Sequence, residues 1–87
     1  MQSEPYTLAE IAGRDGWRCH ICQGAVPERL LGKAGYHPKG PSIDHLVPLA
    51  LGGDDIRANV ALAHHRCNSL KGATLPVAGV QLQLLAA

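Results

Sequence analysis

The sequence has almost no aromatic residues: no Phe, one Trp and two Tyr among 87 residues. The core must therefore consist mainly of Leu, Val, Ile and Ala, and a chain this short can bury only a thin one. Domains of this size commonly need a disulfide or a bound metal to stabilise them. We expect residues 1–87 to form one domain that is stapled in one of these two ways.

Long apolar runs and a secretory leader are also lacking. No run approaches the roughly 18 apolar residues of a membrane span, and residues 1–5 lack the basic start and apolar stretch of a signal peptide. We therefore expect a cytoplasmic protein without a membrane partner. Its three cysteines cannot pair completely within one chain, and thiols in a reducing compartment bind metal more often than they form disulfides. The expected staple is therefore zinc.

Whole segments of the chain lack charge of one sign. Acids are the only charged residues in 1–13 and in 40–55, whereas 14–39 has five bases against two acids and 56–87 has three bases and no acid. Two basic segments, each with a net charge of +3, thus flank an acidic one. This arrangement suits a polyanion-binding surface around an acidic metal pocket, and it equally suits an ordinary mixed surface.

Local patterns predict a small α+β fold. Thr7 and Glu10 match a capping box, which marks the start of a short N-terminal helix. In the rest of the chain, short apolar stretches predict the strands, and Gly72 ends the last predicted helix. The predicted elements are a helix over 8–14, strands over 42–47 and 59–62, and a helix over 64–71. The apolar tail, 73–87, is expected to pack on the core, with a partner surface as the alternative.

Two Cys/His pairs have the spacing of a zinc site. Two residues separate Cys19 from Cys22, and two residues separate His64 from Cys67. Such a spacer lets both side chains of a tight turn reach one ion, so the pairs supply four ligands for tetrahedral Zn²⁺. Because this set leaves no open coordination position, we expect a structural zinc ion whose binding is coupled to folding. His65 remains the alternative to His64 as the fourth ligand.

Several short motifs occur in order between and just after these pairs. They are Asp44-His45-Leu46-Val47-Pro48-Leu49, Gly52-Gly53, Asn59, Leu62, Cys67-Asn68 and Lys71-Gly72. Together they resemble the HNH endonucleases, in particular the small phage and bacterial form with a zinc-binding C-x-x-C upstream. The resemblance covers about residues 14–72 and implies the ββα-metal fold, also called the HNH or His-Me finger, with a hairpin over 42–62 followed by the helix.

The resemblance assigns catalytic roles to four of these residues. His45 is the candidate general base, because an imidazole can take a proton from water near neutral pH. Neighbouring side chains of a strand point to opposite faces, so Asp44 would instead hold a divalent ion, Mg²⁺ or Mn²⁺. By the family's pattern, Asn68 would reach the same ion and Asn59 would hold the loop that carries the base. Asn68 departs from the final His of the family's name.

The implied function is a divalent-metal-dependent endonuclease that hydrolyses DNA phosphodiester bonds by nicking or double-strand cutting, with low sequence specificity. Arg18, Arg66 and Lys71 are candidate phosphate contacts, although solvated surface charge explains each of them equally well. The expected partner is double-stranded DNA, and the resemblance also allows a role beside a phage DNA-packaging terminase. The alternative function is a non-catalytic zinc module for binding DNA or protein, which would not need the catalytic residues.

Overall fold

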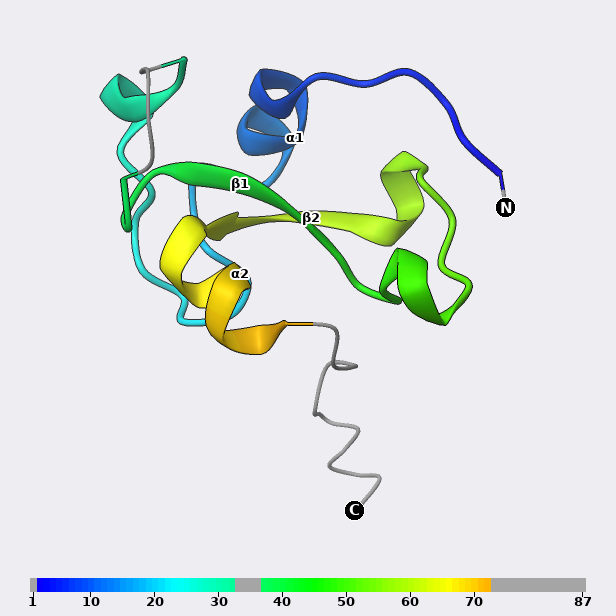
Figure 1. The fold of residues 1–87 in the computed structure, drawn as a ribbon. Coiled ribbons are helices and arrows are strands. Elements are labelled where there is room, and N and C mark those ends of the chain that lie inside the picture. Colours follow the sequence, from blue (N-terminus) through cyan, green and yellow to red (C-terminus); the bar gives the residue numbers. More distant parts are fainter. Residues whose placement is uncertain (1, 33–36, 73–87) are drawn as a thin grey trace.

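The computed structural model describes residues 2–32 and 37–72 of the chain. Within these residues two α-helices, two strands and three short 3-10 helices follow one another along the chain. Figure 1 shows the two strands crossing the middle of the fold, with one α-helix on each side of them. The prediction that residues 73–87 pack on the core lies outside the described residues.

The two strands form an antiparallel hairpin. Strand β1 spans Pro41–His45 and strand β2 spans Val60–His64, in a register that pairs Ile43 with Leu62. The predicted strands are thus confirmed, with ends displaced by one or two residues. The first four residues of β2 are apolar and buried, as expected of a strand that is covered on both faces. The hairpin therefore supplies the middle of the core.

Helix α1 spans Leu8–Arg14 and begins at the predicted cap. The Thr7 hydroxyl oxygen accepts a hydrogen bond from the backbone N–H of Glu10 at 3.0 Å, which satisfies a donor that the first turn leaves unpaired. Ile11 and Ala12 are completely buried. The helix therefore covers one side of the hairpin with a narrow aliphatic face.

Helix α2 spans His65–Lys71, so it begins one residue later than predicted. It ends at Gly72, whose φ of 60° lies in the left-handed region that glycine adopts without strain. None of its residues is completely buried, although Cys67 packs against the core. Neither α-helix in the described part of the chain has the length and apolar character needed to cross a membrane.

The core is small and almost entirely aliphatic, as the lack of aromatic residues predicts. Its buried cluster consists of Ala12, Cys19, Val26, Leu62 and Ala63, with Leu8, Trp17 and Cys67 packed against it. Two of the predicted zinc ligands are therefore also core residues. Packing in this domain and the arrangement of the cysteines depend on each other.

Two short helices that the sequence did not predict shape the connection between the strands. One 3-10 helix spans Leu49–Leu51 and another spans Arg57–Asn59. Between them, Gly52 has a φ of 90°, which favours glycine. The connection therefore folds back on itself beside the end of β1 instead of making one tight turn.

Leu62 is completely buried in the centre of the hairpin, so it tests the packing of the core. Leu62→Ala is expected to lower the free energy of unfolding by about 2–5 kcal/mol, because the cavity cannot close fully. Leu70 on α2 is 77% exposed and is the matched control. Leu70→Ala should change the same quantity by less than about 0.5 kcal/mol. Denaturant unfolding of the zinc-loaded protein measures both, and equal effects would contradict this core.

Candidate functional site

The four predicted zinc ligands meet at one place. Ligand atoms of Cys19, Cys22, His64 and Cys67 all lie within 4.8 Å of one another. Nδ1 of His64 is 3.4 Å from Sγ of Cys22 and 3.7 Å from Sγ of Cys67. The first two cysteines follow α1, whereas His64 ends β2 and Cys67 lies in α2. The cluster therefore joins the N-terminal part of the fold to its last helix.

A hydrogen bond to the backbone sets the tautomer of His64. Its Nε2 lies 2.8 Å from the carbonyl oxygen of Ala25, and a carbonyl can only accept. Nε2 therefore carries the hydrogen, and Nδ1 presents its lone pair to the cysteines, as metal-binding histidines require. The alternative ligand, His65, instead lines a separate cavity together with Leu8 and Leu30.

The pKa values of Cys19 and Cys67 are shifted in opposite directions. Burial raises the pKa of Cys19, but hydrogen bonds from the backbone, including that of Cys22, outweigh burial and bring it to about 6. Burial raises the pKa of Cys67 to about 12, and the neighbouring sulfur atoms of Cys22 and Cys19 add to the rise. A bound divalent cation would lower the pKa of every cysteine in the cluster, because metal binding favours the thiolate form. The donor set thus fits a structural zinc ion.

Three of the predicted catalytic residues line one cavity. Asp44 and His45 at the end of β1 and Asn68 on α2 share a hollow of about 260 Å³, which Pro48 and Leu49 also line. Cys67 of the cluster lies in α2, and β1 pairs with β2, which ends at His64. The cavity therefore lies between elements that the cluster joins.

Asp44 is the most deeply buried charged group of this cavity, with 3% of its side chain exposed. Its Oδ2 is 2.6 Å from Nε2 of His20, and its Oδ1 is 3.1 Å from Nζ of Lys71. Burial alone would raise the pKa of Asp44, but the hydrogen bonds from His20 and Lys71 hold it below its usual value. Asp44 is therefore a carboxylate at neutral pH, surrounded by groups that carry or can accept positive charge.

Asn68 directs its amide nitrogen toward strand β1. Nδ2 donates to the carbonyl oxygen of Ile43 at 2.9 Å and to Oγ of Ser42 at 3.2 Å. Oδ1 accepts no hydrogen bond from the described residues, so it remains available as a ligand. An amide oxygen and the carboxylate of Asp44 are the hard ligands that Mg²⁺ and Mn²⁺ prefer. These two residues therefore fit a divalent ion.

Asn59 closes the loop that follows His45. Its Oδ1 accepts a hydrogen bond from the backbone N–H of Val47 at 2.9 Å, and its Nδ2 donates to the carbonyl oxygens of Val47 at 3.0 Å and Asp54 at 2.7 Å. Gly53 is necessary for this closure, since a Cβ there would lie 1.8 Å from the carbonyl oxygen of Val47. These contacts are the kind that the resemblance implied for Asn59.

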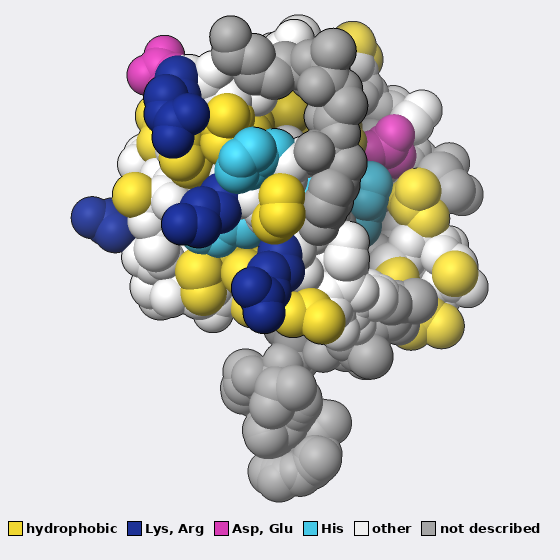
Figure 2. Space-filling model, turned by 60° about the vertical axis from the view of Figure 1, so that its left-hand side comes forward, with side chains coloured by type: hydrophobic (Ala, Val, Ile, Leu, Met, Phe, Trp, Pro, Cys, Tyr) yellow, Lys and Arg dark blue, Asp and Glu magenta, His cyan; other side chains and the backbone are white. Residues whose placement is uncertain are grey.

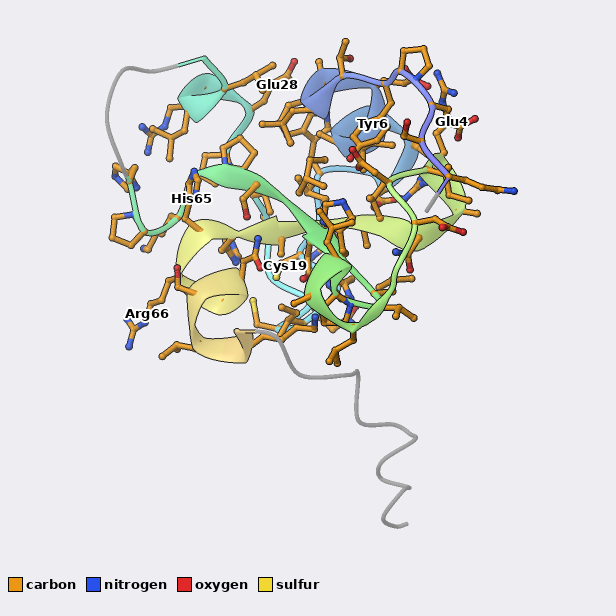
Figure 3. The ribbon with its side chains drawn as sticks, turned by 45° about the vertical axis from the view of Figure 1, so that its right-hand side comes forward. Glu4, Tyr6, Cys19, Glu28, His65 and Arg66 are labelled. Carbon is orange, nitrogen blue, oxygen red and sulfur yellow. The ribbon has the colours of Figure 1, made fainter. Side chains whose placement is uncertain are left out.

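The candidate phosphate contacts divide into two kinds. Arg18 and Arg66 are exposed, and Figure 3 shows Arg66 pointing away from the fold. Figure 2 shows Lys and Arg side chains gathered around histidines on one face. Lys71 differs from the arginines, because its side chain is only 9% exposed and its Nζ binds Asp44 and the carbonyl oxygen of His45. The structure therefore places Lys71 inside the site and not at its border.

Two site residues were not found from the sequence. His20 contacts Asp44, and Asp55 accepts a hydrogen bond from His45 with 2.9 Å between Oδ1 and Nε2. His20 lies between two predicted zinc ligands, and Asp55 lies in a turn beside a second acid. Neither residue therefore belongs to a sequence pattern that is typical of a functional site. Only the tertiary contacts distinguish Asp55 from Asp54.

The ligand assignment predicts one tightly bound zinc ion per chain. His64→Ala should lose most of the bound zinc and unfold, because removal of one ligand weakens binding that is coupled to folding. His65→Ala, which changes the neighbouring histidine, should keep the zinc. Elemental analysis of the purified proteins, with circular dichroism for the fold, measures both. Loss of zinc from the His65 variant and not from the His64 variant would reverse the assignment.

Comparison with known proteins agrees with this arrangement of residues. The model of a family described as HNH endonuclease matches residues 19–74, which is more than half of the chain. The match includes all four members of the cysteine and histidine cluster and the three predicted catalytic residues that line the 260 Å³ cavity. Comparisons with the curated proteins and with the solved structures found no match. The chain therefore belongs to the HNH endonuclease family.

Proposed function

We propose that this domain is a divalent-metal-dependent nuclease that hydrolyses phosphodiester bonds of double-stranded DNA. The observation that carries the proposal is the meeting of Asp44, His45 and Asn68 at one cavity. Two oxygen ligands and an imidazole at one place match the needs of phosphodiester hydrolysis: a site for a cation and a base for water. A purely structural zinc module has no need of this combination.

His45 acts as the general base in this proposal. A water oxygen attacks phosphorus, its proton moves to the imidazole, and the bond from phosphorus to one sugar oxygen breaks. His45 suits this role because Asp55 holds one ring nitrogen and leaves the other for the water. Asn59 is a positioning residue, since its side chain fixes the backbone of Val47, two residues after His45.

Asp44 and Asn68 would hold the divalent ion. Such an ion, when bound, stabilises negative charge on the scissile phosphate and on the leaving oxygen. Without a bound ion, the ammonium group of Lys71 neutralises part of the charge of Asp44. His20 holds the second oxygen of Asp44 and so orients the carboxylate.

Arg18 and Arg66 would hold the DNA backbone in this proposal. Their exposure leaves the guanidinium groups available to phosphates, and contacts of this kind position DNA without reading its sequence. We therefore propose weak sequence preference and strong dependence of binding on salt. A terminase partner remains a prediction of the resemblance.

Plasmid nicking tests the proposal. The wild-type protein should convert supercoiled plasmid to open-circle or linear DNA with Mg²⁺ or Mn²⁺, and not after these ions are removed. His45→Ala should lower the rate by roughly 10²- to 10⁴-fold, the usual contribution of a general base. The control is His37→Ala, which changes an exposed histidine outside the cavity and should cleave at the wild-type rate.

A contaminating nuclease would not follow the His45 substitution, so equal nicking by wild type and His45→Ala would contradict the assigned role. If neither protein nicks DNA under any condition while both are folded and loaded with zinc, a non-catalytic zinc module becomes the better function. DNA binding by the same preparations then decides between a DNA-binding and a protein-binding module.

A further inference from the structure

One carboxylate oxygen joins the candidate base to the N-terminal part of the chain. Oδ1 of Asp55 lies 2.9 Å from Nε2 of His45 and accepts a second hydrogen bond from the Tyr6 hydroxyl at 2.5 Å. Asp55 lies in the connection between the strands, and Tyr6 precedes α1. Figure 3 shows Tyr6 beside that connection. Through Asp55, the N-terminal part of the chain therefore reaches the candidate base.

The protonation states of this group follow from its chemistry. Hydrogen bonds from Tyr6 and His45 lower the pKa of Asp55, so its carboxylate is ionised and can only accept. Burial, reinforced by Asp55, raises the pKa of Tyr6 to about 12, so the hydroxyl keeps its proton at neutral pH. Nε2 of a neutral His45 must therefore carry the ring hydrogen. Nδ1 then holds the lone pair and makes no hydrogen bond within residues 2–32 and 37–72.

We propose that Asp55 and Tyr6 are positioning residues that fix the orientation and the tautomer of His45, and that residues 2–6, the N-terminal arm, thereby complete the active site. This inference rests on the proposed role of His45 as the base. It goes beyond the family match, because the arm lies outside residues 19–74. The nuclease would then depend on a segment that precedes its family domain.

Backbone hydrogen bonds hold the arm in place. The N–H of Asp55 donates to the carbonyl oxygen of Gln2 at 2.8 Å, and the N–H of Glu4 donates to the carbonyl oxygen of Asp55 at 3.1 Å. The Glu4 carboxylate accepts from the backbone N–H of Arg57 at 2.7 Å, and Asp54 accepts from the backbone N–H of Gln2 at 2.8 Å. The arm thus forms a short parallel bridge with the connection between the strands. This pairing fixes the position of Tyr6 relative to Asp55.

The expected effect is moderate in size. A buried carboxylate that orients a catalytic histidine can contribute up to about 10⁴-fold to a rate. The Asp55 side chain is 39% exposed, so water can replace part of its contact with the ring. We therefore expect Asp55→Asn to lower the cleavage rate by roughly 10- to 100-fold, within the range seen when a residue that orients a functional histidine is removed.

Single-turnover cleavage of saturating duplex DNA by the full chain with Mn²⁺ tests the effect on rate. Asp55→Asn should cleave slowly while its affinity for DNA and its zinc content stay at wild-type values. Asp55→Glu keeps an anionic acceptor and should recover part of the rate. Tyr6→Phe removes one hydrogen bond and should cost a few-fold. Glu28→Gln is the control, because it makes the same carboxylate-to-amide change at an exposed residue outside the arm and the cavity, and its rate should be unchanged.

The ring ¹⁵N chemical shifts of His45 test the tautomer without any need for activity. Wild type should show hydrogen on Nε2 of the neutral ring, and Asp55→Asn should shift the population toward hydrogen on Nδ1. A wild-type cleavage rate for Asp55→Asn, or an unchanged tautomer in that variant, would overturn the proposal. An inactive wild-type protein would contradict the nuclease function instead, and the ¹⁵N shifts would still decide whether Asp55 positions the ring.

Discussion

The sulfur and nitrogen ligands of the zinc cluster bring together segments that little else would hold. A core of this size supplies roughly 3–5 kcal/mol on its own, whereas zinc binding to small Cys/His sites is worth about 10–16 kcal/mol at neutral pH. Cys19 and Cys67 also belong to the packed core, so metal binding and side-chain packing stabilise the same few residues. Zinc bound at this cluster would therefore be the largest source of stability in this fold.

The position of the candidate catalytic cavity follows from the cluster. His20 is fixed by the zinc ligands on either side of it, and its ring holds the carboxylate of Asp44. Asn68 directly follows the ligand Cys67 and donates a hydrogen bond to Ile43 in the middle of β1. Asn68 is thus one residue away from a predicted zinc ligand, and Asp44 contacts a residue that adjoins one. A small domain can in this way place functional groups accurately without a large core.

Local patterns in the sequence were sufficient for the parts of the fold that depend on near neighbours. The Thr7 cap, the two strands and the two metal-binding pairs each rest on patterns of a few residues, and the structure contains all of them. The role of Asn59 came from the family resemblance, and its hydrogen bonds have the expected form. The 3-10 helices were missed, because each consists of three residues with no distinctive pattern.

Contacts between distant residues could not be predicted in this way. His20 and Lys71 meet Asp44 across 24 and 27 residues, and Tyr6 meets Asp55 across 49. Such contacts depend on how helices and loops pack, which no short spacing encodes. Lys71 illustrates the consequence: its sequence suited a phosphate contact on the surface, whereas in the fold its ammonium group is buried against a carboxylate.

X-ray diffraction from crystals of the zinc-loaded protein soaked in Mn²⁺, with anomalous scattering recorded for each metal, tests most directly whether one zinc-braced hairpin builds a second cation site. Our account predicts a zinc peak within the cysteine and histidine cluster and a manganese peak between Asp44 and Asn68. A zinc peak without manganese at that cavity would contradict it.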